Sequence, residues 1–190
     1  MIPTETEIIK LHKKYAKSET HFKRMFVHGE IVALIAASLA GKIDKDVDLS
    51  VLRSSCLLHD VGAYMFMDEA GKIDKSYYQL HPMVGSKILE EEGVDKRICR
   101  IVIEHQLLAL PEGYSAPIPE KNYLPKSIES RLLNYADRYH SKVPVFNSVA
   151  FLRSKLKDYQ RQSKIFEAWV DEFGLPDIDE FAEKFNQGIR

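Results

Sequence analysis

Four histidines and two aspartates of this 190-residue chain have the types and the spacing that a metal site requires. His28 leads an apolar stripe that continues at helical spacing through Val32 and Ile35, so its ring is expected to face the interior. His59 ends a similar stripe that begins at Leu52. Either histidine alone has an ordinary explanation as a hydrogen-bonded core residue. The interpretation therefore depends on their acidic neighbours, because imidazole and carboxylate together are usual ligands of Zn, Mn, Fe and Ni.

Asp60 directly follows His59 and comes just before Gly62, where the third helix is expected to end. A carboxylate in the last turn of a helix faces the negative end of the helix dipole, which is unfavourable unless a cation compensates. The alternative is a solvent-facing Asp60 beside a core histidine. A divalent metal would explain both residues at once, because it would use the buried imidazole and offset the carboxylate charge.

Three further residues occupy positions from which they could join such a site. His81 precedes Pro82 at an expected helix start, His105 aligns with the apolar Ile98, and Asp137 falls in an apolar helix. Each has its own structural explanation, as a cap, a core histidine or a solvated edge residue. Taken together they favour a metal site, because sites inside helical bundles draw ligands from several helices. The remaining histidines show no comparable setting: His12, His21 and His140.

The composition narrows the class of protein. Hydrophobic residues make up 45% and charged residues 29%, as in ordinary soluble domains, and the net charge of −1 argues against an extended nucleic-acid surface. The two cysteines are too few for a disulfide framework. No apolar run is long enough to span a membrane, and the N-terminus lacks a signal-peptide core. We therefore expect a cytoplasmic protein.

Helical spacing dominates and no convincing alternating strand is present, which predicts an all-α fold with residues 1–190 in a single domain. Thr4 and Glu7 form a capping-box pattern, and Gly41 is expected to end the second helix in a left-handed conformation. The expected helices begin near Thr4, Glu19, Ser50, Pro82, Asp95 and Ser127. Further helices are expected over residues 145–173, which Gly174 ends, and around Phe181 and Phe185. Loops are expected at residues 64–80 and 109–126.

The ordered set His28, His59-Asp60 and Asp137 resembles the H…HD…D signature of the HD superfamily of metal-dependent phosphohydrolases. Residues 57–62, with the sequence LLHDVG, are similar to the HDIG variant of its core motif. The resemblance covers about residues 20–140 and implies an HD-domain helical bundle. Residues 145–187 would then form a helical C-terminal extension.

The resemblance also implies a ligand set and a mechanism. His81 and His105 match the two additional histidines of the family's binuclear members, and Asp60 would bridge the two metals as a catalytic residue. Metal-activated water would attack the phosphorus of a small phosphorylated substrate such as a nucleotide. The metal would be Mn, Fe, Ni, Zn, Co or Mg, and a homodimer is left open. The first metal would be held by His28, His59, Asp60 and Asp137, and the second by Asp60, His81 and His105.

The chain departs from the family pattern in two places. Many HDIG proteins carry lysine directly after the glycine, whereas this chain has Ala63, and Arg24 is the candidate for the missing cation at the catalytic site. The signature of the HD-GYP group is also absent, because Gln106 and Ser115 replace its second histidine and its proline. Cyclic di-GMP is therefore not the expected substrate.

Two other functions use the same residues. HD-fold di-iron oxygenases resemble this ligand set closely and differ in needing redox-active iron. A non-catalytic HD domain that senses a nucleotide is the second alternative. The complete ligand set favours an enzyme, and the HDIG-like surroundings favour hydrolysis.

Overall fold

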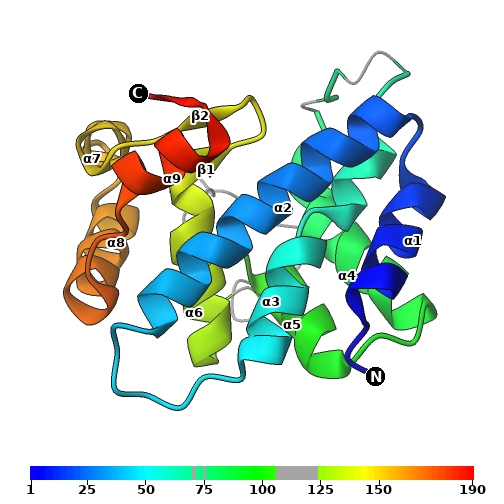
Figure 1. Cartoon of the computed structure of the whole chain (residues 1–190), viewed down its shortest axis with the longest axis horizontal. Helices are drawn as coiled ribbons and strands as arrows, with labels where there is room; N and C mark the ends of the chain where they lie inside the picture. Colours follow the sequence, from blue (N-terminus) through cyan, green and yellow to red (C-terminus); the bar gives the residue numbers. More distant parts are fainter. Residues whose placement is uncertain (70–71, 75, 106–123) are drawn as a thin grey trace.

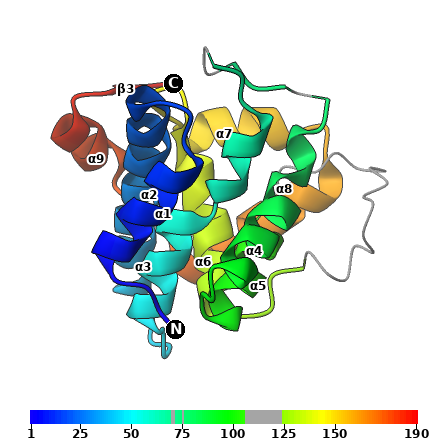
Figure 2. The ribbon, with the colours of Figure 1, turned by 90° about the vertical axis from the view of Figure 1, so that its right-hand side faces the viewer.

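The all-α fold predicted from the sequence is confirmed by a computed structural model, which describes residues 1–69, 72–74, 76–105 and 124–190. The central helix α2 runs through the middle of the molecule, and the two termini lie at opposite ends (Figures 1 and 2). The helices are α1 (Glu5–Tyr15), α2 (Glu19–Ala40), α3 (Leu49–Leu58), α4 (His81–Glu91), α5 (Lys96–Glu104), α6 (Ile128–Ala136), α7 (Val149–Leu156), α8 (Gln160–Phe173) and α9 (Ile178–Phe185).

Side chains at the helix ends explain where most helices begin. The capping box predicted for α1 is present, since Thr4 accepts from the backbone of Glu7 while the Glu7 carboxylate accepts from the backbone of Thr4. Asp95 caps α5 and Ser127 caps α6, as the sequence predicts. Gly41 differs from the prediction, because its φ of −71° is right-handed. Its N–H still bonds to the carbonyl of Ala37, so the last turn of α2 closes without a left-handed residue.

The core is built around α2, whose inward face is fully buried and packs against α3 and α6. Its apolar stripe is the one that His28 leads, which places that histidine inside the bundle. Helix α4 packs against α5 and against a short 3₁₀ helix, Val61–Phe66, that follows α3. The 3₁₀ helix thus connects the layer of α2 and α3 to the layer of α4 and α5.

The third helix is shorter than predicted. It ends at Leu58, and Asp60 lies outside it with φ −102° and ψ 8°, directly before the 3₁₀ helix. The reason is the close approach of α4 to Gly62, where a Cβ atom would clash with the carbonyl oxygen of His81 and would lie 2.9 Å from the Cα of Gly85. The prediction that Asp60 lies in the last helical turn is therefore wrong, although the residue is buried as expected.

The other boundaries differ in detail. His81 is the first residue of α4 rather than the residue before it, and Pro82 lies at the helix start. The predicted loop at residues 64–80 contains a 3₁₀ turn, Tyr78–Leu80, and a bridge between Met67 and Ile73. Most of the predicted loop at 109–126, up to residue 123, lies outside the described residues.

The C-terminal extension is helical with one small sheet that the sequence did not predict. Strand β1 (His140–Ser141) pairs antiparallel with β2 (Val145–Phe146), which pairs in parallel with β3 (Gly188–Ile189). This pairing brings the end of the chain back to β2, whose partner β1 packs against α2. Gly174 ends α8 with a φ of +74°, at the position where the sequence predicts the break. No helix in the described ranges is long and apolar enough to cross a membrane.

Candidate metal centre

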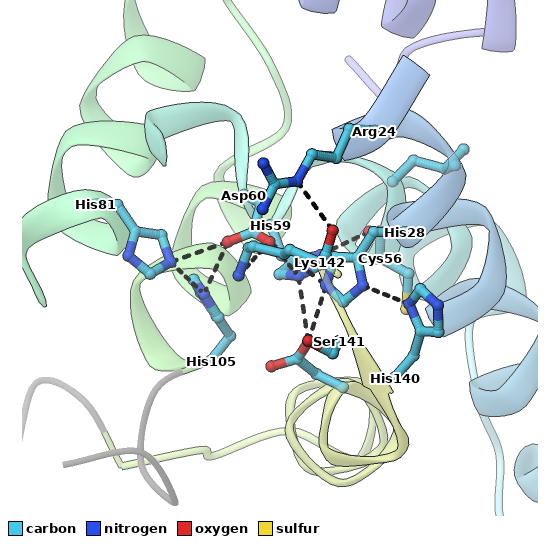
Figure 3. A network of polar contacts seen from close by, with 12 residues as sticks. Arg24, His28, Cys56, His59, Asp60, His81, His105, His140, Ser141 and Lys142 are labelled. Atoms are coloured by element: carbon cyan, nitrogen blue, oxygen red, sulfur yellow. Dashed lines mark hydrogen bonds and ion pairs between the residues drawn. The ribbon is translucent and has the colours of Figure 1, made fainter. Parts of the chain in front are cut away.

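The fold brings all six predicted site residues together in the interior. They come from α2, the end of α3, the start of α4, and the ends of α5 and α6, and each residue is at most 7% exposed. Figure 3 shows five of them with their nitrogen and oxygen atoms turned toward a common region. The six residues are His28, His59, Asp60, His81, His105 and Asp137.

The first group of atoms lies between α2, α3 and α6. Nε2 of His28 is 3.4 Å from Oδ2 of Asp60 and 3.1 Å from Oδ1 of Asp137. Nε2 of His59 is 3.1 Å and 3.6 Å from the same two oxygens. The other oxygen of Asp137 is held by Arg138. Two imidazole nitrogens and two carboxylate oxygens thus alternate around one point, which suits a single cation.

The second group lies on the opposite side of Asp60. Nε2 of His81 is 2.9 Å from Oδ1 of Asp60, and Nε2 of His105 is 3.8 Å from it. The two Nε2 atoms are 3.0 Å apart. Because Oδ1 of Asp60 faces this group while Oδ2 faces the first, the carboxylate is oriented to bridge two cations.

In three of the four histidines, Nδ1 donates a hydrogen bond to a backbone carbonyl on the side of the ring away from the cluster. Nδ1 lies 2.7 Å from the Cys56 carbonyl in His59, 2.7 Å from the Tyr78 carbonyl in His81, and 2.6 Å from the Val102 carbonyl in His105. A carbonyl oxygen only accepts, so a neutral ring must keep its lone pair on Nε2. The lone pairs of His81 and His105 then face each other at 3.0 Å, an arrangement that a bound cation makes favourable.

Unpaired polar atoms support the same interpretation. Nε2 of His28 and Nε2 of His59 are buried, and no hydrogen-bond partner of normal geometry is found for them among the described residues. Buried polar atoms without such partners are costly. The buried oxygens of Asp60 have ion pairs with Lys142 and with the surrounding imidazoles. Candidate ligand atoms of His28, His59 and Asp60 all lie within 4.8 Å of one another, as do those of Asp60, His81 and His105. The residues therefore fit a pair of divalent metals.

The electrostatics of the cluster favour cation binding. Burial lowers the pKa of His28 to about 4, and burial also lowers the pKa of His81 and of His105, so these rings are neutral at pH 7. Burial would raise the pKa of Asp60, but the neighbouring His59 and Lys142 hold it well below its usual range. His59 behaves differently: burial opposes its charge, but Asp60 and Asp137 outweigh burial and raise its pKa to about 10. A metal ion must displace that proton to bind.

Lys142 is the main site residue that the sequence did not reveal. Its Nζ lies 2.8 Å from Oδ2 of Asp60 and 5.5 Å from the ring centroid of Tyr78, which in turn stacks on His81. Burial would lower the pKa of Lys142, but the attraction of Asp60 outweighs it and raises the pKa. Lys142 therefore places a positive charge beside Asp60, a role for which the sequence offered Arg24 as the candidate. The Nε of Arg24 donates to the backbone carbonyl of Lys142, at 2.9 Å (Figure 3), and its part in catalysis stays a prediction.

His140 is a second residue whose role was missed, because the sequence predicted no special setting for it. It is 5% exposed, and its Nδ1 lies 2.8 Å from Nδ1 of His28. Its Nε2 lies 2.9 Å from Oε1 of Gln187. His12, in contrast, is a core histidine that bonds to Tyr64 and to a backbone carbonyl. No local spacing could have identified His140, since its contacts depend on the pairing of short strands.

Comparison with known families identifies the fold that carries this site. Residues 25–142 match the HD domain model. The chain belongs to the HD domain family. HD domains bind divalent metals, and the family is one of metal-dependent phosphohydrolases, which agrees with the histidine and aspartate clusters described above.

Individual relatives are distant, and the chain spans only part of them. A tRNA (cytidine(56)-2'-O)-methyltransferase of Thermoplasma volcanium is 29% identical over 139 residues, which cover 72% of this HD chain and 36% of that protein. A protein of the same name from Picrophilus torridus is 28% identical over 148 residues, 77% of the chain and 39% of the relative. The chain thus spans well under half of the length of these two relatives.

A solved structure shares the fold. The HD domain of the phosphodiesterase PgpH of L. monocytogenes superposes with a TM-score of 0.55, and the alignment covers 94% of each chain. The sequence identity is 16%, so the likeness concerns the arrangement of the helices. It includes most of the C-terminal extension, because 94% of this chain is aligned.

Proposed function

We propose that this HD domain is a metal-dependent phosphohydrolase that cleaves the phosphoester of a nucleotide or another small phosphorylated compound. The observation that carries the proposal is the orientation of Asp60, whose two oxygens face two separate groups of imidazole nitrogens. Bound metals in such a site activate water and stabilise the charge on attacking and leaving oxygens. Membership of the HD family and the fold shared with a phosphodiesterase domain support the same reaction class.

The residues of the chain have separate roles in this proposal. Asp60 and Asp137 provide negative charge, and the carbonyl-bound rings of His81 and His105 present Nε2 lone pairs without reorganisation. His59 is held in the same way through Nδ1, but it must lose its Nε2 proton before it can bind a metal. Lys142 offers a positive charge beside Asp60, where it would hold a phosphoryl oxygen. Cys56 is the thiol nearest in sequence to His59 and Asp60. It is buried, and burial raises the pKa of the thiol, so Cys56 is a poor nucleophile.

The same ligands are compatible with a di-iron oxygenase. The two archaeal relatives are named as methyltransferases, but the region aligned with this chain is only 36% and 39% of their lengths. We carry neither activity over to this chain. Hydrolysis is preferred because Lys142 places a fixed positive charge beside the bridging carboxylate, which suits an anionic phosphoryl group.

The test combines metal analysis with a hydrolysis assay. The purified protein is analysed for bound metals and then assayed with p-nitrophenyl phosphate, bis(p-nitrophenyl) phosphate and a panel of nucleotides in the presence of Mn, Ni, Co or Mg. We expect metal-dependent release of phosphate or nitrophenol that is lost in Asp60→Asn. Bound iron with no hydrolysis of any of these substrates would transfer the proposal to the oxygenase class. Metal binding without any turnover would favour the nucleotide-sensing alternative.

A further inference from the structure

His28 is supported from behind by another imidazole, unlike the other three histidines of the cluster. Its Nδ1 lies 2.8 Å from Nδ1 of His140, and the two ring planes are inclined by only 25°. The remaining rings bond through Nδ1 to backbone carbonyls, which can only accept. An imidazole nitrogen can either donate or accept, so the contact between His28 and His140 does not by itself determine which nitrogen of His28 carries the proton.

A third residue, Gln187, determines which ring donates in the hydrogen bond between His28 and His140. Oε1 of Gln187 lies 2.9 Å from Nε2 of His140. An amide oxygen only accepts, so His140 donates from Nε2, and the neutral ring then has its lone pair on Nδ1. That lone pair accepts the proton on Nδ1 of His28. The lone pair of His28 is consequently placed on Nε2, the atom that faces Asp60 and Asp137.

We propose that His140 and Gln187 are positioning residues, which hold His28 in the tautomer that ligates a metal through Nε2. The inference rests on the proposed metal site and concerns one of its ligands only. Burial supports it, because His140 is 5% exposed and its ring meets that of Phe146 edge to face, with a centroid separation of 4.9 Å.

The arrangement makes the metal centre depend on the end of the chain. Gln187 lies outside residues 25–142, the region that matches the HD domain, and is placed by the pairing of β3 with β2. His140 itself is in β1, whose partner Phe146 also pairs with Ile189. The small sheet therefore presents a hydrogen-bond acceptor from the C-terminal extension to His140. Figure 3 shows the ring of His140 behind that of His28.

The test compares two substitutions of similar size at His140. In His140→Asn, a side-chain oxygen takes the approximate place of Nδ1 and can accept from His28, whereas His140→Leu removes the acceptor. Zinc affinity is measured by calorimetry against a competing chelator. We expect His140→Leu to weaken zinc binding by about 10- to 100-fold, as loss of a partner behind a ligand usually does, and His140→Asn to restore most of the affinity.

Gln187 provides a variant that spares the core, since its side chain is half-buried. Gln187→Met should weaken zinc binding in the wild-type background. It should have no effect in the His140→Asn background, because the asparagine oxygen accepts from His28 without help from Gln187. Long-range ¹H–¹⁵N spectra of the zinc-loaded protein should show His140 protonated at Nε2 and His28 at Nδ1. Thermal unfolding followed by circular dichroism checks that each variant is folded.

The outcomes separate this inference from the proposed function. Zinc binding of His140→Leu at wild-type affinity, or a proton on Nδ1 of His140 in the zinc-loaded protein, would overturn the positioning role and leave the metal centre in place. Wild-type protein that binds neither zinc nor manganese, nickel or cobalt would overturn both. Equal loss of affinity in His140→Asn and His140→Leu would indicate that only the shape of the ring matters, which also contradicts the inference.

Discussion

The Nζ atom of Lys142 lies 2.8 Å from Oδ2 of Asp60, the same oxygen that faces His28 and His59. An ammonium group in this position competes with a metal for the carboxylate, and it can also hold a phosphoryl oxygen of a substrate. The two roles have opposite consequences when the charge is removed. A substitution of Lys142 can therefore distinguish its effect on metal affinity from its effect on turnover.

We predict that Lys142→Met, which keeps the length of the stem, leaves metal affinity unchanged or stronger and lowers kcat by about 100-fold or more. Calorimetry with zinc and a steady-state assay with p-nitrophenyl phosphate measure the two effects. Lys142→Arg is the control that keeps the charge and should retain more activity. A Lys142→Met variant with wild-type kcat, or one that loses its metal, would contradict this role.

The two sides of the cluster should respond differently to substitution. Asp60→Asn removes the charge shared by both groups and is expected to abolish binding of both metals, while circular dichroism shows the helical content retained. His81→Ala or His105→Ala removes a ligand of the second group only, so the protein should keep one metal per chain. Elemental analysis of the purified variants counts the metals.

Asp137→Asn is the matched substitution for the first group, because Oδ1 of Asp137 faces only His28 and His59. The substitution should lower the occupancy of the first metal site and leave that of the second unchanged. If His81→Ala and His105→Ala leave the metal content of the wild type unchanged, the centre is mononuclear.

Most of the site was predictable because its signals are local. His28 and His59 stand at helical spacing from apolar residues, and caps such as Asp95 lie next to the helices that they begin. The order of His28, His59-Asp60 and Asp137 then indicated the family, which the match to residues 25–142 confirms. Their roles as metal ligands remain a prediction, supported by the distances in the cluster.

The residues that were missed are defined by contacts between distant parts of the chain. Lys142 reaches Asp60 from a segment with no helical periodicity, and Gln187 reaches His140 through strands of two residues each. Neither arrangement leaves a pattern in the sequence. The end of α3 was misplaced for a similar reason, because the packing of α4 against Gly62, rather than local propensity, decides where the helix stops.

Gly62 gives a stability prediction from this packing. A methyl group at this position would overlap the backbone of His81 and of Gly85, so Gly62→Ala must push the start of α4 away from Asp60. We expect a loss of roughly 1–3 kcal/mol in the free energy of unfolding, together with weaker binding of the second metal. Gly85→Ala is the matched control, because the nearest atom to its Cβ would lie 3.2 Å away and the cost should be smaller. Equal effects in urea unfolding would contradict this explanation.

His12 allows a test of pH-dependent stability away from the metal cluster. Burial lowers its pKa to about 4 from the value of 6.5 expected in the unfolded chain, while the ring bonds to Tyr64 and to the carbonyl of Leu57. Between these two values the unfolded state binds a proton that the folded state does not, so stability rises with pH. The contribution of His12 is therefore fully present above pH 6.5 and is lost as the pH falls toward 4, by at most about 3 kcal/mol.

The measurement is urea unfolding between pH 4.5 and 7.5 in the presence of a chelator, for the wild type and for His12→Gln. Glutamine keeps a polar side chain but does not titrate, so the variant should lose stability at pH 7 and depend less steeply on pH below 6.5. The difference between the two slopes isolates His12, because every other buried histidine is common to both proteins. Parallel curves would mean that the pKa of His12 is the same in the folded and the unfolded chain, which would contradict the lowering by burial.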